Sequence, residues 1–263
     1  MSFVHQCLLE TKAPIPFPAA GVTIEQPSIR DIAMIGGDSA LMVGVEALTK
    51  NYKKMVDELA SSDISNFDIL MRTIKSPDEQ TKFIFDAVTK VLSLLFPNSK
   101  VFFTPMSMII QSEDGSQHMI DRDSFDGLSG IIYDMFCVAE LHNDAVDEYN
   151  PSGPRAAALV EKFRKKRELL AKLRQERGED DQNISLFGKY ISILSVGLKI
   201  SKNELATYSV YQLIEEFKRF QLKESFDYTF QAKMAGATKI KDAKDWMETI
   251  QLGKLERDEL ELN

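Results

Sequence analysis

The stretch IGGDSALMVG contains adjacent glycines whose spacing could serve chemistry. A phosphate cradle needs glycines spaced so that several backbone N–H groups point inward, usually followed by Lys and Ser or Thr. Here Gly36 and Gly37 are adjacent, and the carboxylate of Asp38 would repel a phosphate. A nucleophile elbow needs G-x-S-x-G, but the residue two positions after Ser39 is Leu41. The spacing therefore predicts a loop that enters a helix and has no catalytic role.

The remaining polar residues give little support for metal or covalent chemistry. The stretch HNDAVDEY, which begins at His142, gathers one histidine and three acidic residues, but on a helix end they would fan around the axis. A solvated acidic turn is therefore favoured over a metal site. Cys7 and Cys137 lie far apart without CxxC spacing, which is typical of free thiols in a reducing cytoplasm. The sequence predicts no metal, no cofactor and no catalytic residue.

An enzyme site assembled from dispersed acidic residues stays an alternative. Convergent carboxylates of raised pKa in one pocket would favour it.

A basic run occupies residues 162–177, with eight Lys or Arg and two Glu. Such a run could lie along nucleic acid, and binding that falls steeply with salt would favour that alternative. However, the acidic stretch GEDD follows at once, Phe163 is the only aromatic residue of the run, and the chain has a net charge of -8. We therefore expect an exposed connecting helix, with docking on an acidic protein surface as an intermediate option. Nucleic acid is not expected as a partner.

The composition is typical of a folded, soluble protein. Of the 263 residues, 44% are hydrophobic and 27% are charged, so one large domain or two small ones can bury a core. The N-terminus lacks the basic lead and sustained apolar region of a signal peptide. No window approaches the roughly eighteen apolar residues of a membrane span. We therefore expect an intracellular protein that does not bind a membrane.

Helical periodicity covers well over half of the chain, which predicts a mainly α, bundle-like fold of the α+β class with one small antiparallel β-hairpin. The first segment, residues 1–30, should be an extended proline-rich arm, because its prolines oppose a helix. The other expected segments are an α+β domain at 31–150 with the hairpin near 101–121, a charged connecting helix at 151–183, and a C-terminal helical domain at 184–263.

Local signals also predict where helices begin. Asp38 and Ser39 are N-cap candidates for the helix after the glycine pair. Ser76 is the candidate for the next long helix, with Pro77 in its first turn. That helix should bury a stripe at helical spacing, formed by Phe83, Ala87, Val88, Val91, Leu92 and Leu95.

The pair Asp114-Gly115 lies between two extended runs and is a strong hairpin signal, because both central residues of such a turn must accept positive φ. Farther along, a capping box at Ser209 opens a long helix that Gly236 should close. Trp246 should anchor a short terminal helix through its large ring and a bonded indole N–H. The long helix should bury Leu213, Phe217 and Phe230, whereas part of its aromatic stripe is expected to meet a partner.

The chain contains three short motifs, each of which occurs once. A Q-P-[ST]-x-x-D-I-x-x-I-G opening begins at Gln26, a DxxxFxxL helix begins at Asp121, and an A-G-A…D-W-M ending runs from Ala235 to Met247. In this combination the chain resembles tail morphogenesis proteins of tailed bacteriophages from Gram-positive hosts, labelled tail assembly chaperones or tail or baseplate components. The motifs are structural, so the resemblance implies a non-enzymatic protein.

The resemblance implies binding to other phage tail proteins (tape measure, tube or baseplate) during virion morphogenesis in the host cytoplasm. A structural component of the virion tail is the alternative, and a homo-oligomer is left open. A proline-rich arm can lie extended on a neighbour at low entropic cost, and hairpin edges offer free backbone groups. The arm and hairpin should therefore carry most of the partner contact. The candidate contact residues are Pro14, Pro16, Phe17, Pro18, Ile109, Asp114, Gly115, His118 and Phe220.

Overall fold

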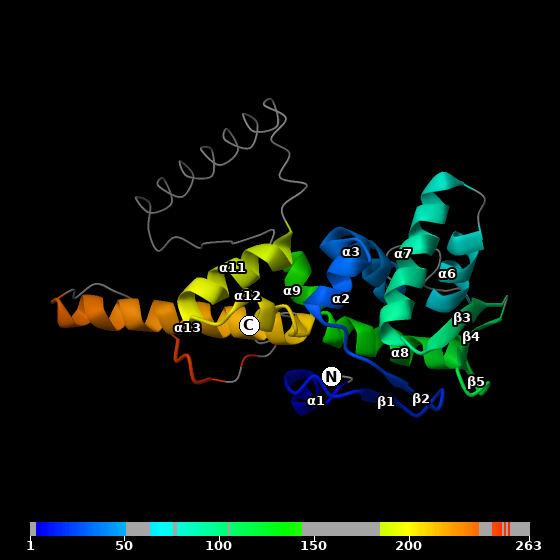
Figure 1. Cartoon of the computed structure of the whole chain (residues 1–263), viewed down its shortest axis with the longest axis horizontal. Coiled ribbons are helices and arrows are strands. Elements are labelled where there is room, and N and C mark those ends of the chain that lie inside the picture. The colour runs from blue at the N-terminus through cyan, green and yellow to red at the C-terminus, as the bar shows by residue number, and fades with distance from the viewer. Residues whose placement is uncertain are drawn as a thin grey trace, which may run out of the picture.

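The computed structural model describes residues 4–50, 64–75, 78–104, 106–143, 185–236, 244–248, 250 and 252. They form helices and two small antiparallel sheets, which confirms the expected α+β class (Figure 1). The helices are α1 (Gln6–Glu10), α2 (Ile29–Met34), α3 (Gly37–Thr49), α6 (Asn66–Lys75), α7 (Glu79–Leu95), α8 (Arg122–Met135), α9 (Val138–Asn143), α11 (Leu186–Leu198), α12 (Lys202–Leu205) and α13 (Val210–Met234). The strands are β1 (Ile15–Phe17), β2 (Val22–Ile24), β3 (Ser99–Phe103), β4 (Ser107–Ser112) and β5 (Gln117–Asp121). The connecting helix expected at 151–183 lies outside the described residues, as does its basic run.

The N-terminal segment is not the extended arm that its prolines predict. It forms the short helix α1 and the hairpin β1–β2, in which Ile15 pairs with Ile24. Leu9, Ile15, Phe17 and Ile24 are all buried. The prolines oppose helix but are compatible with a short edge strand, where Pro16 needs no N–H and points to solvent between two buried neighbours. The segment is therefore part of the hydrophobic core.

This segment also bridges two distant parts of the chain. Phe17 packs against α8 at Gly127, where an added Cβ would lie 3.2 Å from the Phe17 ring. On its other side, Lys12 Nζ donates to Thr207 O (2.7 Å), and the Gln212 side chain donates to the last carbonyl of α1 (2.7 Å). Residues before position 30 thus contact both the central helices and α13.

The IGG stretch forms the turn between α2 and α3, as its spacing predicts. Gly36 and Gly37 both have positive φ, 118° and 79°. Gly36 is the N-cap of α3, so the N-cap prediction for Asp38 and Ser39 is wrong: both lie in the first turn of the helix. Two successive left-handed residues, which glycine tolerates, start the helix earlier than the capping side chains suggest. The Asp38 carboxylate instead accepts a hydrogen bond from Leu186 N at the start of α11.

Helix α7 differs from its prediction at its N-terminal end. Asp78 is its N-cap and accepts from Thr81 N (2.7 Å), so the assignment of that role to Ser76 is wrong. The predicted stripe is buried from Ala87 onward, but Phe83 is 58% exposed. The close contact with α3 lies at Ala87, one turn after Phe83.

The expected hairpin is part of a three-stranded antiparallel sheet in the order β3-β4-β5. Its register fixes two faces, because side chains alternate along each strand. On the inner face, Met108, Ile110 and Ile120 are fully buried. This sheet lies at one end of the molecule beside α7 and α8, and the free end of α13 lies at the other (Figure 1).

Strands β4 and β5 turn at Asp114-Gly115, as predicted, but only Gly115 has positive φ (84°). The loop holds four residues, with Ser112 N donating to Ser116 O and Gly115 N donating to Ser112 O (3.0 Å each). The longer loop therefore removes the need for positive φ at Asp114.

Helix α13 begins with the predicted capping box at Ser209, and Gly236 follows its end with φ 94°. Leu213 is buried as expected. Phe230 is 58% exposed, so the prediction that it is buried is wrong. The C-terminal half of α13 extends past α11 in Figure 1, which leaves Phe230 without the helix that covers the first half.

Helix α11 packs on the first half of α13 through aromatic rings. Phe217 stacks on Tyr190 with ring centroids 4.1 Å apart. The ring of Phe220 occupies the place where a Cβ on Gly197 would lie. Phe220, a candidate partner contact, is thus half-buried within the chain.

Backbone and charged contacts join α13 to the N-terminal half. Ile29 N at the start of α2 donates to Tyr208 O (2.9 Å), next to a β-bridge between Ser28 and Ser209. Lys218 of α13 forms an ion pair with Glu140 of α9. The described helices on both sides of residues 144–184 therefore share one hydrophobic core.

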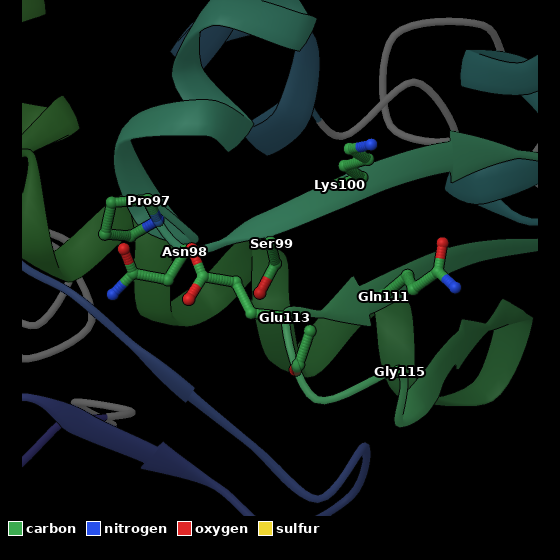
Figure 2. Close-up of a pocket in the computed structure, with 8 residues that line it drawn as sticks. Pro97, Asn98, Ser99, Lys100, Gln111, Glu113 and Gly115 are labelled. Carbon is green, nitrogen blue, oxygen red and sulfur yellow. The ribbon is translucent and has the colours of Figure 1, made fainter.

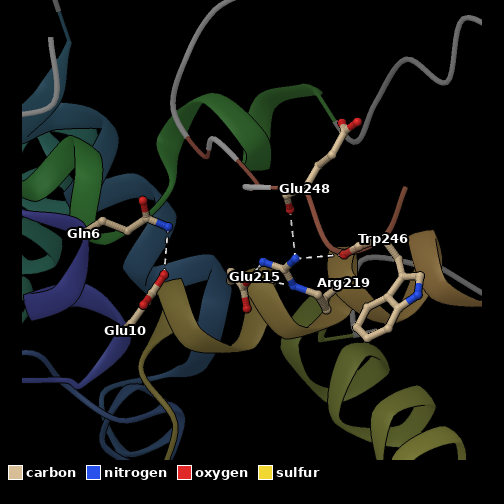
Figure 3. Close-up of polar contacts among 6 residues, drawn as sticks. All are labelled: Gln6, Glu10, Glu215, Arg219, Trp246 and Glu248. Atoms are coloured by element: carbon tan, nitrogen blue, oxygen red, sulfur yellow. Dashed lines mark hydrogen bonds and ion pairs between the residues drawn. The ribbon is translucent and has the colours of Figure 1, made fainter. Parts of the chain in front are cut away.

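The segment around Trp246 is held by α13, but through its backbone. Arg219 Nη1 donates to Trp246 O and to Glu248 O, each at 2.9 Å, while Nε and Nη2 bond Glu215 (Figure 3). Residues 246–248 form turns and a bend, so the short helix expected there is wrong among these residues. The Trp246 ring is half-buried. A single guanidinium therefore docks this segment, a role that no local pattern around Arg219 indicates.

A capping carboxylate gives the fold a predictable response to acid. Asp121 caps α8 and accepts from Ser124 N (3.0 Å) and Ser124 Oγ (2.7 Å), and these bonds lower the pKa of Asp121. Because the folded pKa is below the unfolded value of about 3.9, the stabilisation is present above about pH 4 and is lost as pH falls through the folded pKa. Asp121→Asn keeps a capping group that does not ionise. We expect its free energy of unfolding, measured by urea denaturation from neutral to acidic pH, to fall less steeply than that of the wild type.

The control is the neighbouring change Asp123→Asn, because the Asp123 carboxylate makes neither bond to Ser124. Its free energy of unfolding should fall at acidic pH as steeply as that of the wild type. An equally steep fall of the free energy of unfolding for Asp121→Asn and the wild type would show that protonation of Asp121 does not cause the loss of stability in acid.

Candidate functional site

The side of the β3-β4-β5 sheet that faces away from the core carries an apolar row across all three strands. The register places Phe102, Ile109 and Met119 opposite one another, with Lys100, Gln111 and Gln117 as the next row. We call these six residues the outer face. Paired residues of an antiparallel sheet share one side, so both rows point the same way.

The apolar row is open to solvent. Phe102 is 47% exposed and Met119 is 56% exposed, and Ile109 between them is half-buried. The opposite side of the same strands is packed into the core, so the exposure is a property of the outer face and not of a loosely formed sheet. Scattered exposed apolar residues are ordinary on a protein surface, but a contiguous row of aromatic, β-branched and methionine side chains is typical of a surface that binds another molecule.

A polar hollow of about 470 Å³ adjoins this row at the turn end of the sheet. Figure 2 shows that its lining comes from the link between α7 and β3, from the adjoining ends of β3 and β4, and from the β4–β5 turn. Lys100 and Gln111 belong to both the hollow and the outer face. The remaining lining residues are Pro97, Asn98, Ser99, Ser112, Glu113 and Gly115.

The charges around the outer face are few and separated. Lys100 on β3 is the only charged residue among these six. Asp121 follows Met119 by two positions on the same side of β5, and Glu113 and Asp114 lie on the β4–β5 turn. Hydrogen bonds from Ser116 Oγ (2.6 Å) and N (2.9 Å) lower the pKa of Asp114, so this carboxylate stays ionised into acid. The outer face therefore carries one positive charge on β3, and acidic residues lie near both ends of β5.

The structure gathers some of the predicted contact residues and separates others. Ile109 lies in the apolar row, and Asp114 and Gly115 form the exposed turn. His118 lies on the inner face next to Gly21 of the β1–β2 turn, where an added Cβ would lie 3.4 Å from its Nδ1. Phe17 is buried, whereas Pro14, Pro16 and Pro18 are exposed on the N-terminal segment, away from the outer face. Phe220 lies against α11.

Sequence reasoning missed Phe102, Met119 and Lys100. Their alternation with buried residues was readable in the strands, but both faces of the sheet are rich in apolar residues. Which face meets the core is decided by α7 and α8, and the exposed one could therefore not be chosen from the pattern alone.

A second hollow lies between α1 and α13 and brings three carboxylates together. It is lined by Glu10, Glu215 and Glu216 together with Tyr208, Tyr211, Gln212 and Arg219. Glu215 is paired with Arg219 (2.5 Å), and Glu10 accepts from the Gln6 amide (2.7 Å; Figure 3). Burial and the charge of Glu215 raise the pKa of Glu216. Two of the three carboxylates are thus bound to neighbouring side chains.

Both cysteines are free thiols, as predicted. Cys137 is buried, and burial raises its pKa well above the usual range, so it stays protonated and unreactive. No helix among the described residues is long and apolar enough to cross a membrane.

Residues 179–251 match the family model described as the YomV second domain. YomV is a protein of a Bacillus phage region, so the match points to a phage protein. The matched range includes α11, α12, α13 and the segment that Arg219 holds. No curated protein and no solved structure matches the chain.

Proposed function

We propose that the chain is a non-enzymatic phage protein that acts in tail assembly by binding another tail protein through the outer face. The match to the YomV second domain supports the phage origin. The observation that carries the binding role is the solvent-exposed row of Phe102, Ile109 and Met119 on a well-packed sheet. Such a row lowers the free energy of a complex when a partner removes it from water. The host cytoplasm is the proposed place of action.

The N-terminal segment is not part of this proposal. Its apolar side chains are already buried against α8 and the core, and extending it onto a partner would expose them. The proposed binding surface is the outer face of the sheet, because a partner can contact its apolar row without any unfolding of the chain.

A charge placed in the apolar row tests the role of the outer face. Affinity-tagged chain from infected cells is expected to co-purify with a tail protein, and Met119→Lys should reduce that recovery by about tenfold or more, because burying an unpaired ammonium opposes association. The side chain of Met119 is exposed, so the melting temperature should stay close to that of the wild type. Mass spectrometry of the captured proteins identifies the partner.

Met34→Lys is the matched control, because Met34 is 84% exposed at the end of α2 and lies outside the outer face. It should retain the partner. Equal recovery with both variants would reject the outer face as the binding surface, and recovery of no tail protein with the wild type would reject the tail-assembly role. Presence of the chain in purified virions would favour a structural tail component over a transient chaperone.

A further inference from the structure

We infer that the outer face binds the outer face of a second copy of this chain when no tail partner occupies it. The inference deepens the proposed function, because it gives the same surface a second occupant that the tail partner must displace. Its first support is the symmetry of the apolar row, in which Ile109 lies at the centre, with Phe102 and Met119 on the two sides.

Two such faces can be related by a two-fold axis that runs parallel to β4. Strand β3 of one copy then lies opposite β5 of the other, and Ile109 meets Ile109 of the second copy. Phe102 meets Met119 of the second copy, and the symmetry repeats this contact. Aromatic–thioether contacts are favourable, and face-to-face packing of nearly aligned sheets is a common arrangement of antiparallel sheets.

The charges agree with this arrangement. Lys100, the only charged residue of the outer face, lies opposite Gln117 of the second copy. It thereby comes next to the turn that carries Glu113 and Asp114 in that copy. No like charges of the outer face meet, and each Lys100 approaches an acidic turn. Complementary potentials of this kind favour one partner and one orientation.

The size of the face indicates a weak complex that another protein can displace. Three strands at about 4.8 Å spacing and five residues at about 3.4 Å give a flat area of about 250 Å². A standard interface buries about 800 Å² on each partner. The pairing is therefore expected to be in fast exchange at moderate concentration, and to shield the apolar row until a larger partner surface replaces it.

Sedimentation velocity of the full chain, from low micromolar to millimolar concentration, tests the inference. We expect a concentration-dependent dimer for the wild type and for Met34→Lys, and a dimer about tenfold or more weaker for Met119→Lys. Wild-type protein that stays monomeric over the whole range would overturn the inference. So would a dimer that Met119→Lys leaves unchanged.

A charge exchange between copies distinguishes this geometry from other modes of association. Lys100→Glu and Glu113→Lys each place like charges together in their own dimers, so each should self-associate less than the wild type. An equimolar mixture of the two variants pairs Glu with Lys at both symmetric contacts, and it should recover the dimer. Absence of recovery on mixing would overturn the proposed orientation. Co-purification of the tail partner is a separate measurement, so failure of the dimer leaves the proposed function standing, and failure of partner capture leaves the dimer standing.

Discussion

Removal of residues 1–24 is expected to abolish cooperative folding. The deletion takes away five buried apolar side chains, those of Val4, Leu9, Ile15, Phe17 and Ile24. At about 1.5–3 kcal/mol each, their burial contributes on the order of 7.5–15 kcal/mol, which is comparable with the whole stability of a typical domain, about 5–15 kcal/mol. Thermal unfolding followed by circular dichroism and near-ultraviolet spectra should show no sharp transition.

The control is Pro16→Ser, which changes an exposed position of β1 and keeps its buried neighbours. It should melt close to the wild type. A truncated protein with an unchanged melting temperature would show that the N-terminal segment is an independent arm after all. Co-purification of the tail partner with the truncated protein would then test whether the segment contributes to binding.

Gly44→Val is expected to destabilise the packing of α3 on α7. Gly44 lets α3 approach α7 so closely that an added Cβ would lie 2.5 Å from the Ala87 carbonyl oxygen and 2.6 Å from Val91 Cγ2. Part of this obstacle is the backbone of α7, which cannot rotate away, so the two helices must separate. Overpacking of this kind costs about 1–3 kcal/mol and occasionally more, and the melting temperature should fall by several degrees.

Gly188→Ala in α11 is the matched control, because its added Cβ would meet only the Ser185 side chain at 3.3 Å. It should be tolerated, since alanine is the better helix former. Equal stability of Gly44→Val and wild type would show that α3 and α7 do not pack as closely as described.

The elements that sequence patterns located correctly are those with local causes. The capping box at Ser209 fixes the start of α13, and the chain turns at Asp114-Gly115 and at the IGG stretch. Each of these features depends on the backbone preferences and hydrogen bonds of a few neighbouring residues. The mainly helical α+β class follows from the same signals summed along the chain.

The sequence predicted less well which apolar side chains are buried, because burial depends on which helices and strands pack together. Phe83 and Phe230 have helical spacing that predicts a buried stripe, yet both are more than half exposed. The half of α13 that contains Phe230 extends past α11 (Figure 1). Phe17 shows the reverse. Its proline-rich surroundings predict an exposed arm, but its ring packs against α8 at Gly127.

The sequence by itself therefore determined the mainly helical α+β class, the start of α13 and the turns at Asp114-Gly115 and at the IGG stretch. Only the tertiary structure decided which apolar residues remain in contact with water. The row of Phe102, Ile109 and Met119 is apolar on a sheet whose other face is apolar too, and α7 and α8 can cover one face only. The same holds for Arg219, whose bonds to the carbonyls of Trp246 and Glu248 join residues 27 and 29 positions away. Such contacts depend on long-range packing, which periodicity and capping, as local properties, do not encode.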